Sequence, residues 1–197
     1  MLKAIRFFAV MWGYAVILSF SSCASTKHGE TAGQFSPVYI TDTKKISVLP
    51  PQYMDGELES LQFFSGSFKS HTFSSQVYIQ ADQEGVSMLL LNDLGVSMGT
   101  LSYSAEKLSF SSPYFPQNIN AEYILADFQN TYYDTVALQK NYAAAGLAFY
   151  CKDEGNREWR RIQDGEYIIE EIEKDGQNVT ITNRLRSYTY ELKEIKE

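Results

Sequence analysis

Histidine, cysteine and positive charge are scarce in this sequence of 197 residues. Its two histidines stand apart and its two cysteines form no Cys-x-x-Cys pair, so we expect neither a metal site nor another cofactor. Two cysteines also exclude a disulfide framework of the kind that holds small secreted domains together. Because 24 acidic residues outnumber 17 basic ones and the net charge is −7, we do not expect binding to nucleic acid.

Two catalytic motifs are matched in residue type but not in the structural context that their chemistry requires. Residues 95–99 read Gly-x-Ser-x-Gly, but that motif needs a strand-to-helix turn and a histidine base later in the chain. Both histidines, His28 and His71, precede Ser97, and the hydrophobic pattern places Ser97 in a strand. Residues 104–107 match Ser-x-x-Lys but form a polar turn rather than the helix that this chemistry needs. We therefore expect no catalytic residues and no enzyme activity.

The longest apolar run lies at the N-terminus, where residues 7–20 follow Lys3 and Arg6. A basic start, an apolar middle and small residues before a cut site are typical of a secretory signal. The run ends in Ser-Phe-Ser-Ser-Cys, which resembles the lipobox of bacterial lipoproteins and implies a signal peptide over residues 1–22 and lipidation of Cys23. A signal peptide cut elsewhere and a transmembrane anchor are the alternatives, although a spanning helix needs about 20 apolar residues.

The residues after the predicted lipid anchor indicate where the protein is held. Ala24 follows the cysteine, and by the sorting rule of enteric-type bacteria this implies the outer membrane, with the protein facing the periplasm. Residues 24–45 are polar, so we expect residues 23–45 to be a lipidated cysteine and a flexible tether. Residues 46–197 are then of a length that fits one domain.

Aromatic and β-branched residues are abundant in that domain and favour strands. From residue 58 to residue 110, short segments of alternating hydrophobicity are separated by turn sequences, as in an antiparallel meander. Asp-Gly hairpin signals return after residue 147, where alternating residues such as Val179 and Ile181 indicate one buried face. The sequence therefore predicts a mainly β fold of five or six strands, a helical insertion and about five more strands.

The insertion predicts two helices. Asn120 can cap a helix that begins at Ala121, and a second helix is expected from residue 134 to residue 145, ended by Gly146. An antiparallel sheet of this length tends to curl, so the helices either fill its concave side or cover an apolar cavity. The expected cavity wall consists of Phe110, Phe115, Ile124, Leu125, Phe128 and Tyr132. The alternative for these residues is an ordinary filled core.

Leu94 stands at a predicted hairpin turn, flanked by Asn92, Asp93 and Gly95. A large aliphatic side chain at an exposed turn gains nothing from the core. Either it has a role at the surface, or it folds back onto the edge of the sheet.

Several of these segments resemble a known family. Leu89–Gly95, with a following strand that ends at Leu101, resembles the hairpin of LolB, the outer-membrane lipoprotein receptor. The chain is also similar to uncharacterised LolB-like lipoproteins, some of them encoded beside aryl-polyene lipid synthesis genes, at Leu49–Pro51, at Gly66 and at Tyr123–Gln129. The resemblance covers about residues 46–195. It implies an incomplete antiparallel β-barrel with helices inside its mouth and an apolar cavity that holds acyl chains.

The resemblance also implies a role for one residue. In LolB a leucine protrudes from the hairpin turn and helps to place lipoproteins into the membrane, and Leu94 occupies the matching turn. The proline that usually precedes this leucine is missing, and the two tryptophans, Trp12 and Trp159, do not match those of the family. A polyene or fatty-acid-type lipid is therefore as plausible a cargo as a lipoprotein.

Two functions follow as expectations. The first is binding or transfer of an acylated or polyene lipid, or of a lipoprotein, by a protein that is attached to the membrane through its lipid anchor and can receive the cargo from a periplasmic carrier protein. The second is that of a non-catalytic accessory lipoprotein, which docks a partner protein of an envelope lipid-synthesis or assembly system.

Overall fold

A computed structural model describes residues 35–68, 70–114 and 120–195 of the chain. The predicted signal peptide, Cys23 and Phe115 lie outside the described residues.

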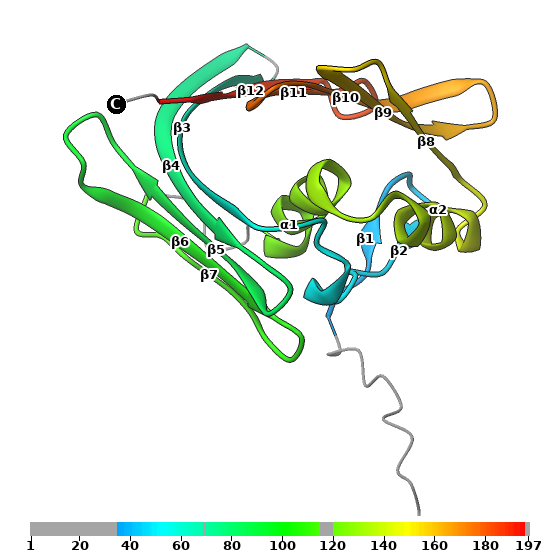
Figure 1. Cartoon of the computed structure of the whole chain (residues 1–197), viewed down its shortest axis with the longest axis horizontal. Helices are drawn as coiled ribbons and strands as arrows, with labels where there is room; N and C mark the ends of the chain where they lie inside the picture. Colours follow the sequence, from blue (N-terminus) through cyan, green and yellow to red (C-terminus); the bar gives the residue numbers. More distant parts are fainter. Residues whose placement is uncertain (1–34, 69, 115–119, 196–197) are drawn as a thin grey trace, which may run out of the picture. The chain divides into compact units, whose positions relative to one another are not determined.

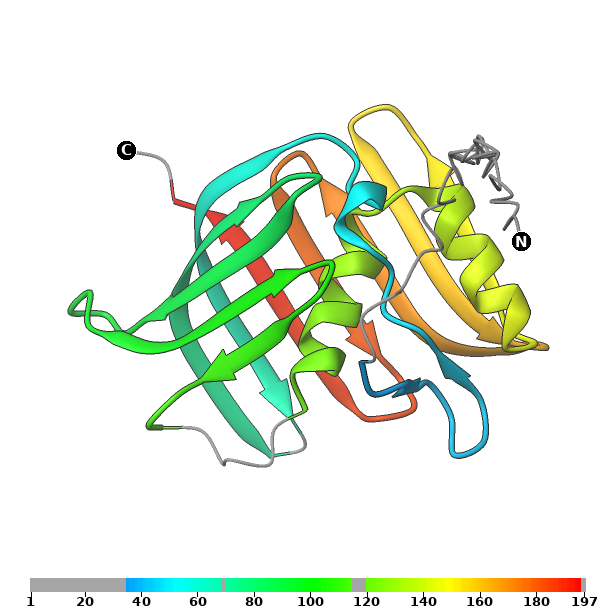
Figure 2. The same cartoon turned by 90° about the horizontal axis from the view of Figure 1, so that it is seen from below.

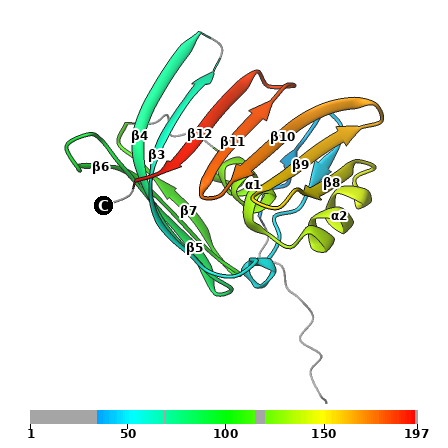
Figure 3. The same ribbon diagram turned by 45° about the horizontal axis from the view of Figure 1, so that its top comes forward.

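Ten strands form one antiparallel sheet in the order β7-β6-β5-β4-β3-β12-β11-β10-β9-β8 (Figures 1 and 3). Their bounds are β3 Leu58–Phe68, β4 His71–Ala81, β5 Gly85–Leu91, β6 Ser97–Ser104, β7 Leu108–Ser111, β8 Ala148–Asp153, β9 Arg157–Asp164, β10 Tyr167–Asp175, β11 Asn178–Asn183 and β12 Tyr188–Glu194. Strands β3 and β12 pair with each other and so join two meanders. The sheet does not close, because β7 and β8 are its two edges. The predicted curled antiparallel sheet with a helical insertion is confirmed.

The strands form where the sequence alternates. In β4, Val77 and Ile79 are buried while Tyr78 lies on the opposite face, as the alternation predicted. The turn that follows is held by Asp82, whose carboxylate accepts hydrogen bonds from the backbone N–H groups of Glu84 and Gly85 at 2.7 and 3.0 Å. These local signals explain why this part of the sheet could be read from the sequence.

The sheet bends around a helix, as Figure 1 shows for β3 and β4. Gly66 of β3 lies where this sheet is tightly packed, since a Cβ there would lie 2.7 Å from Phe73 Cζ, 2.7 Å from Tyr190 Cβ and 2.8 Å from the carbonyl oxygen of Thr189. Only glycine fits this position without a shift of its neighbours.

Two α-helices occur in the described residues, α1 Ala121–Tyr132 and α2 Thr135–Ala144. Asn120 caps α1 by accepting a hydrogen bond from the N–H group of Glu122 at 3.0 Å, and Asp134 caps α2 through the N–H group of Ala137 at 2.8 Å. Both predicted helices are thus confirmed to within a residue or two. Helix α1 lies on the concave side of the sheet, whereas α2 packs beside β8 (Figures 1 and 2). Neither described helix is long and apolar enough to cross a membrane.

The packed domain begins earlier than the sequence indicated. Strands β1 Val38–Tyr39 and β2 Lys45–Ile46 pair with each other in a separate two-stranded sheet. Val38 and Ile46 belong to the hydrophobic core, and a short 3-10 helix, Pro51–Tyr53, follows. Residues 35–45, the end of the predicted tether, are therefore packed rather than flexible, because this segment contains the buried Val38 and leads directly into the buried Ile46.

Candidate functional site

An apolar cavity of about 300 Å³ lies between helix α1 and the concave face of the sheet. Strands β3–β7 supply most of its wall, α1 supplies one side, and β11 and β12 complete it. The lining residues are Phe64, Phe73, Ser74, Ser75, Val77, Ile79, Met88, Leu90, Met98, Leu101, Phe110, Ile124, Asp127, Phe128, Thr131, Tyr132, Ile181, Tyr190 and Leu192. This composition suits an apolar ligand more than a polar one.

The structure places most of the predicted wall residues together. Phe110, Ile124, Phe128 and Tyr132 line the cavity. Leu125 is corrected, because it is 0% exposed and packs in the core away from the cavity. Leu125 lies at the margin of the helix face that turns toward the cavity, and there it packs into the core.

Apart from Phe110 of β7, the strand side of the wall was not predicted from the sequence. Residues such as Val77, Ile79, Met88 and Leu101 looked like the ordinary interior of a sheet, and they line the cavity. Alternation shows which face of a strand turns inward, but it does not show whether the facing space is filled.

One carboxyl group interrupts the apolar wall. Asp127 of α1 lies three residues after Ile124 and one before Phe128, so it belongs to the helix face that turns toward the cavity. Tyr190 donates a hydrogen bond to Asp127 Oδ2 at 2.9 Å, and the hydroxyl of Tyr188 lies 3.0 Å from the same oxygen. A polar residue on an otherwise apolar helix face was the one signal that could have singled out Asp127 in the sequence.

A second carboxyl group lies behind the first. Glu170 of β10 accepts hydrogen bonds from the side-chain amides of Asn183 at 2.8 Å and Asn130 at 3.1 Å. The Tyr188 hydroxyl is 3.3 Å from Glu170 and so lies between the two carboxyl groups. A tyrosine hydroxyl has one proton to donate, so both contacts are satisfied when one carboxyl group is protonated and donates to the tyrosine oxygen.

Burial raises the pKa values of both carboxyl groups, Asp127 and Glu170. Loss of solvation raises the pKa of Asp127 well above its usual value, and the nearby Glu170 raises it further, while the two tyrosine hydroxyls oppose the shift. Burial likewise raises the pKa of Glu170, against the amide hydrogen bonds that favour its charged form. The pair therefore retains protons at pH values where exposed carboxyl groups have lost them.

A buried arginine fixes the end of helix α1 that follows these residues. The Arg160 side chain of β9 is 2% exposed. Its Nη1 donates to the carbonyl oxygens of Asn130 at 3.1 Å and Tyr133 at 2.8 Å, and its Nε bonds Glu158 at 2.8 Å. A cation at a helix C-terminus binds carbonyl groups that have no partner within the helix. Strand β9 thereby holds α1 over the sheet.

Leu94 lies at the tip of the hairpin between β5 and β6, which projects from the rest of the sheet (Figure 2). The side-chain oxygen of Asn92 accepts hydrogen bonds from the N–H groups of Leu94 at 3.0 Å and Val96 at 2.9 Å. Gly95, with φ of 74°, completes the turn. Leu94 is 86% exposed, so it does not fold back onto the edge of the sheet.

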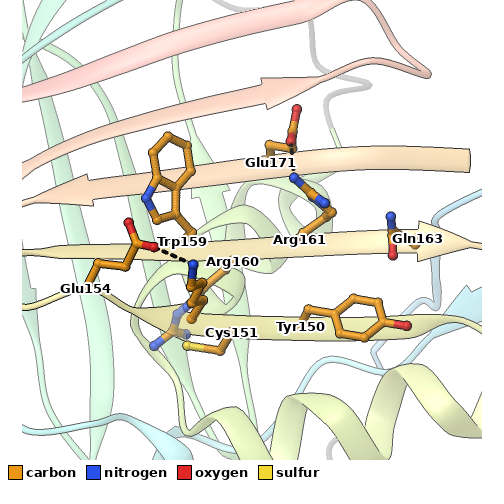
Figure 4. Close-up of a pocket in the computed structure, with 9 residues that line it drawn as sticks. Tyr150, Cys151, Glu154, Trp159, Arg160, Arg161, Gln163 and Glu171 are labelled. Carbon is orange, nitrogen blue, oxygen red and sulfur yellow. Dashed lines mark hydrogen bonds and ion pairs between the residues drawn. The ribbon is translucent and has the colours of Figure 1, made fainter.

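A shallow hollow of about 650 Å³ opens on the face of β8–β10 that carries Trp159 and Arg161 (Figure 4). Arg161 forms an ion pair with Glu171 at 3.0 Å, and Lys152 pairs with Glu154. Tyr150 and Trp159 are exposed there. This hollow is larger than the cavity under α1, but its charged rim and open shape suit a protein surface better than an enclosed ligand.

No catalytic arrangement is found among the described residues. Ser97 is the first residue of β6, and the chain continues from it as a strand. His71, the only histidine in the described part of the chain, begins β4. In the same part, no group of three or more histidine, cysteine or acidic side chains could hold a metal ion.

One comparison with known proteins gives a match. The model of a family described as "Protein of unknown function (DUF3261)" matches residues 59–196, which is more than half of the chain. The match begins within β3 and takes in both α-helices and the other nine strands of the large sheet. A comparison with curated proteins gave no match.

Proposed function

The chain belongs to the DUF3261 family of proteins of unknown function, and on that premise we propose that it is an outer-membrane lipoprotein that binds or transfers an apolar acylated cargo. The cargo occupies the cavity under helix α1. The lipid on Cys23 holds the domain at the periplasmic side of the membrane, and a periplasmic carrier protein can act as donor. The resemblance to LolB supports this proposal.

The observation that carries the proposal is the apolar cavity itself. Its volume of about 300 Å³ stands at the lower end of the range for ligand pockets, roughly 300–1,000 Å³. Such a space suits one slender chain better than the several chains of a lipoprotein anchor, so a single-chain polyene or fatty-acid-type lipid fits better than a lipoprotein. Each buried methylene contributes about 0.8 kcal/mol to binding.

Transfer of such a cargo needs no chemistry. The cavity must bind the cargo about as tightly as the bilayer does. The protein must also contact that bilayer. Leu94 supplies the contact, because it stands fully out from a projecting hairpin beside the exposed Val96. We propose it as the membrane-insertion tip.

A titration tests the proposal. The purified protein is mixed with the methyl ester of a conjugated tetraene fatty acid, whose fluorescence rises in apolar surroundings. We expect a saturable rise with one site per chain. A signal that grows in proportion to added ester, without saturation, would overturn the proposal.

A second candidate function has one observation in its favour. The outward hollow of β8–β10 presents exposed Tyr150 and Trp159 (Figure 4), and aromatic residues are enriched where proteins dock. Under this alternative the protein is an accessory lipoprotein that holds a partner. A photo-cross-linking residue in place of Tyr150, used in living cells, would give one discrete cross-linked product, and its absence would exclude this surface.

A further inference from the structure

The described wall of the cavity contains one acidic side chain and no basic one. Among the described residues that line it, Asp127 carries the only carboxyl group and no side chain is a lysine, arginine or histidine. A phosphate or an ionised carboxylate that entered the cavity would therefore meet no positive group. It would lose its solvation beside Asp127 without a compensating cation on the wall, and it would be repelled by the ionised form of Asp127.

One cation acts on Asp127 from outside the cavity, because the positive charge of Arg186 opposes the rise in the pKa of Asp127. Arg186, in the turn between β11 and β12, lies over the ring of Tyr123 at 4.3 Å and donates to the backbone carbonyl of Tyr39. It does not line the cavity. The other titratable groups that face Asp127 are Tyr188 and Tyr190 of β12, Glu170 of β10 and Tyr142 of α2. None of them supplies a positive charge.

Asp127 retains capacity for a ligand. A carboxyl group offers about four lone-pair positions, and Asp127 accepts hydrogen bonds from the hydroxyls of Tyr188 and Tyr190. The residue is only partly buried, and it lines both this cavity and a small pocket beside Arg186. A hydrogen-bond donor on a bound molecule can reach this surface.

We propose that Asp127 is the polar contact for the head of the cargo, and that the cavity selects an apolar chain with an uncharged, hydrogen-bonding head over a chain with an anionic head. This inference rests on the proposed function and names its cargo class. An alcohol is the simplest member of that class. It donates one hydrogen bond to Asp127 and brings no charge into the apolar wall.

The test compares ligands with one chain and different heads. Tetradecanol, tetradecanoic acid and tetradecylamine compete with the fluorescent ester for the purified protein at pH 7. We expect the alcohol to bind about tenfold more tightly than the acid, the size expected for one hydrogen bond to a charged group. An amine that binds more tightly than the alcohol, in a manner that depends on Asp127, would contradict the uncharged head.

A substitution identifies the residue responsible. Asp127→Asn keeps a hydrogen-bond acceptor for both tyrosines and removes the charge, so the preference for the alcohol over the acid should shrink to about threefold or less. Asp93→Asn at the exposed hairpin is the matched control and should leave the preference unchanged. A preference that survives Asp127→Asn would overturn the assignment.

A measurement without any variant covers the case in which Asp127→Asn fails to fold. Lowering the pH from 7 to 5 protonates more of the acid and of the buried pair, so the acid should approach the alcohol in affinity. Equal affinities at both pH values would overturn the inference while the ester still binds. No saturable binding of the ester would instead remove the proposed function itself.

Discussion

The two halves of the sheet cover their inner faces in different ways. The first half, β3–β7, turns its buried residues toward a cavity of about 300 Å³. The second half, β8–β10, is packed against the helices, with Phe149, Ile162 and Ile169 beside Leu138 and Tyr142 of α2, all nearly inaccessible. We call these the open half and the filled half.

The two halves have different roles, since the filled half supports helix α1 and the open half keeps the cavity. The filled half holds α1 in place through Arg160 and through Asn130, which bonds Glu170. The open half then needs no helix side chains to fill its space, because α1 is already supported from the other side. An apolar cavity lacks the packing contacts that a filled core would make. A small domain can keep such a cavity only if other parts of its core provide enough stability.

The largest expected effect tests the support from the filled half. Arg160→Ala should lower the free energy of unfolding by about 3–5 kcal/mol, because it leaves two buried carbonyl groups without their donor and Glu158 with Lys174 as its remaining cation. Arg161→Ala on the same strand is the matched control, since Arg161 is about half exposed and Glu171 keeps Arg184 as a second partner, so this ion pair should be worth about 0–1 kcal/mol. Urea unfolding measures both, and equal losses would contradict the division of tasks.

A matched pair of insertions compares the two halves directly. Ile162→Trp in the filled half should cost about 1–3 kcal/mol or more, because no space is available for the larger ring. Ile79→Trp in the open half should cost less than about 1 kcal/mol, because the ring can enter the cavity. Ester binding should be lost in Ile79→Trp and kept in Ile162→Trp. Ester binding that persists in Ile79→Trp would place the ligand elsewhere.

The contribution of Asp127 to the free energy of unfolding should depend on pH. Because the folded protein raises the pKa of Asp127, it binds protons that the unfolded chain has released above a pH of about 4. The free energy of unfolding contributed by this group therefore falls as the pH rises from that value toward the raised pKa.

Asp127→Asn lacks the contribution of this group, whereas Glu170, whose pKa is also raised by burial, is present in both proteins. The stability of Asp127→Asn relative to the natural protein should increase steadily as the pH rises from 5 to 8, as measured by urea unfolding at each pH. The lowered pKa values of Glu158 and Glu171 act in the opposite sense but are common to both proteins, so they cancel in the difference. A constant difference across this range would show that Asp127 titrates as an exposed aspartate does.

The smallest effect on stability concerns the hairpin tip of the open half. Leu94→Ser should change the free energy of unfolding by less than about 0.5 kcal/mol and should reduce binding to phospholipid vesicles. Leu185→Ser, in the exposed turn between β11 and β12, is the control and should leave vesicle binding as it is. Flotation of the protein with vesicles measures the effect, and equal losses in both variants would remove the special role of Leu94.

Short-range sequence patterns predicted the fold better than they predicted the site. The caps at Asn120 and Asp134 and the turn at Asn92 involve residues within a few positions of each other, so the sequence alone indicated the helices and the hairpin. The pairing of β3 with β12 joins residues far apart in the chain, and no local pattern indicates it.

The buried polar cluster was hidden for the same reason. Asp127 meets Tyr188 and Tyr190 across about sixty residues, and the adjacent Glu170 and Glu171 carry no local signal that one of them is buried. Glu170 stands two residues before the buried Ile172 and so shares the inner face with it, and the register irregularity between Ile168 and Glu170 allows Ile169 to be buried as well. Strand β1, which begins at Val38, was missed because two-residue strands leave no periodicity to read.

The most direct test of the account follows the methionine methyl groups by NMR while tetradecanol is added. Met88 and Met98 line the cavity, whereas Met54 is buried in the core away from it. The account predicts that the signals of Met88 and Met98 shift and saturate at one equivalent while that of Met54 stays in place. Unmoved signals of Met88 and Met98 at saturating alcohol would contradict an acyl chain in this cavity.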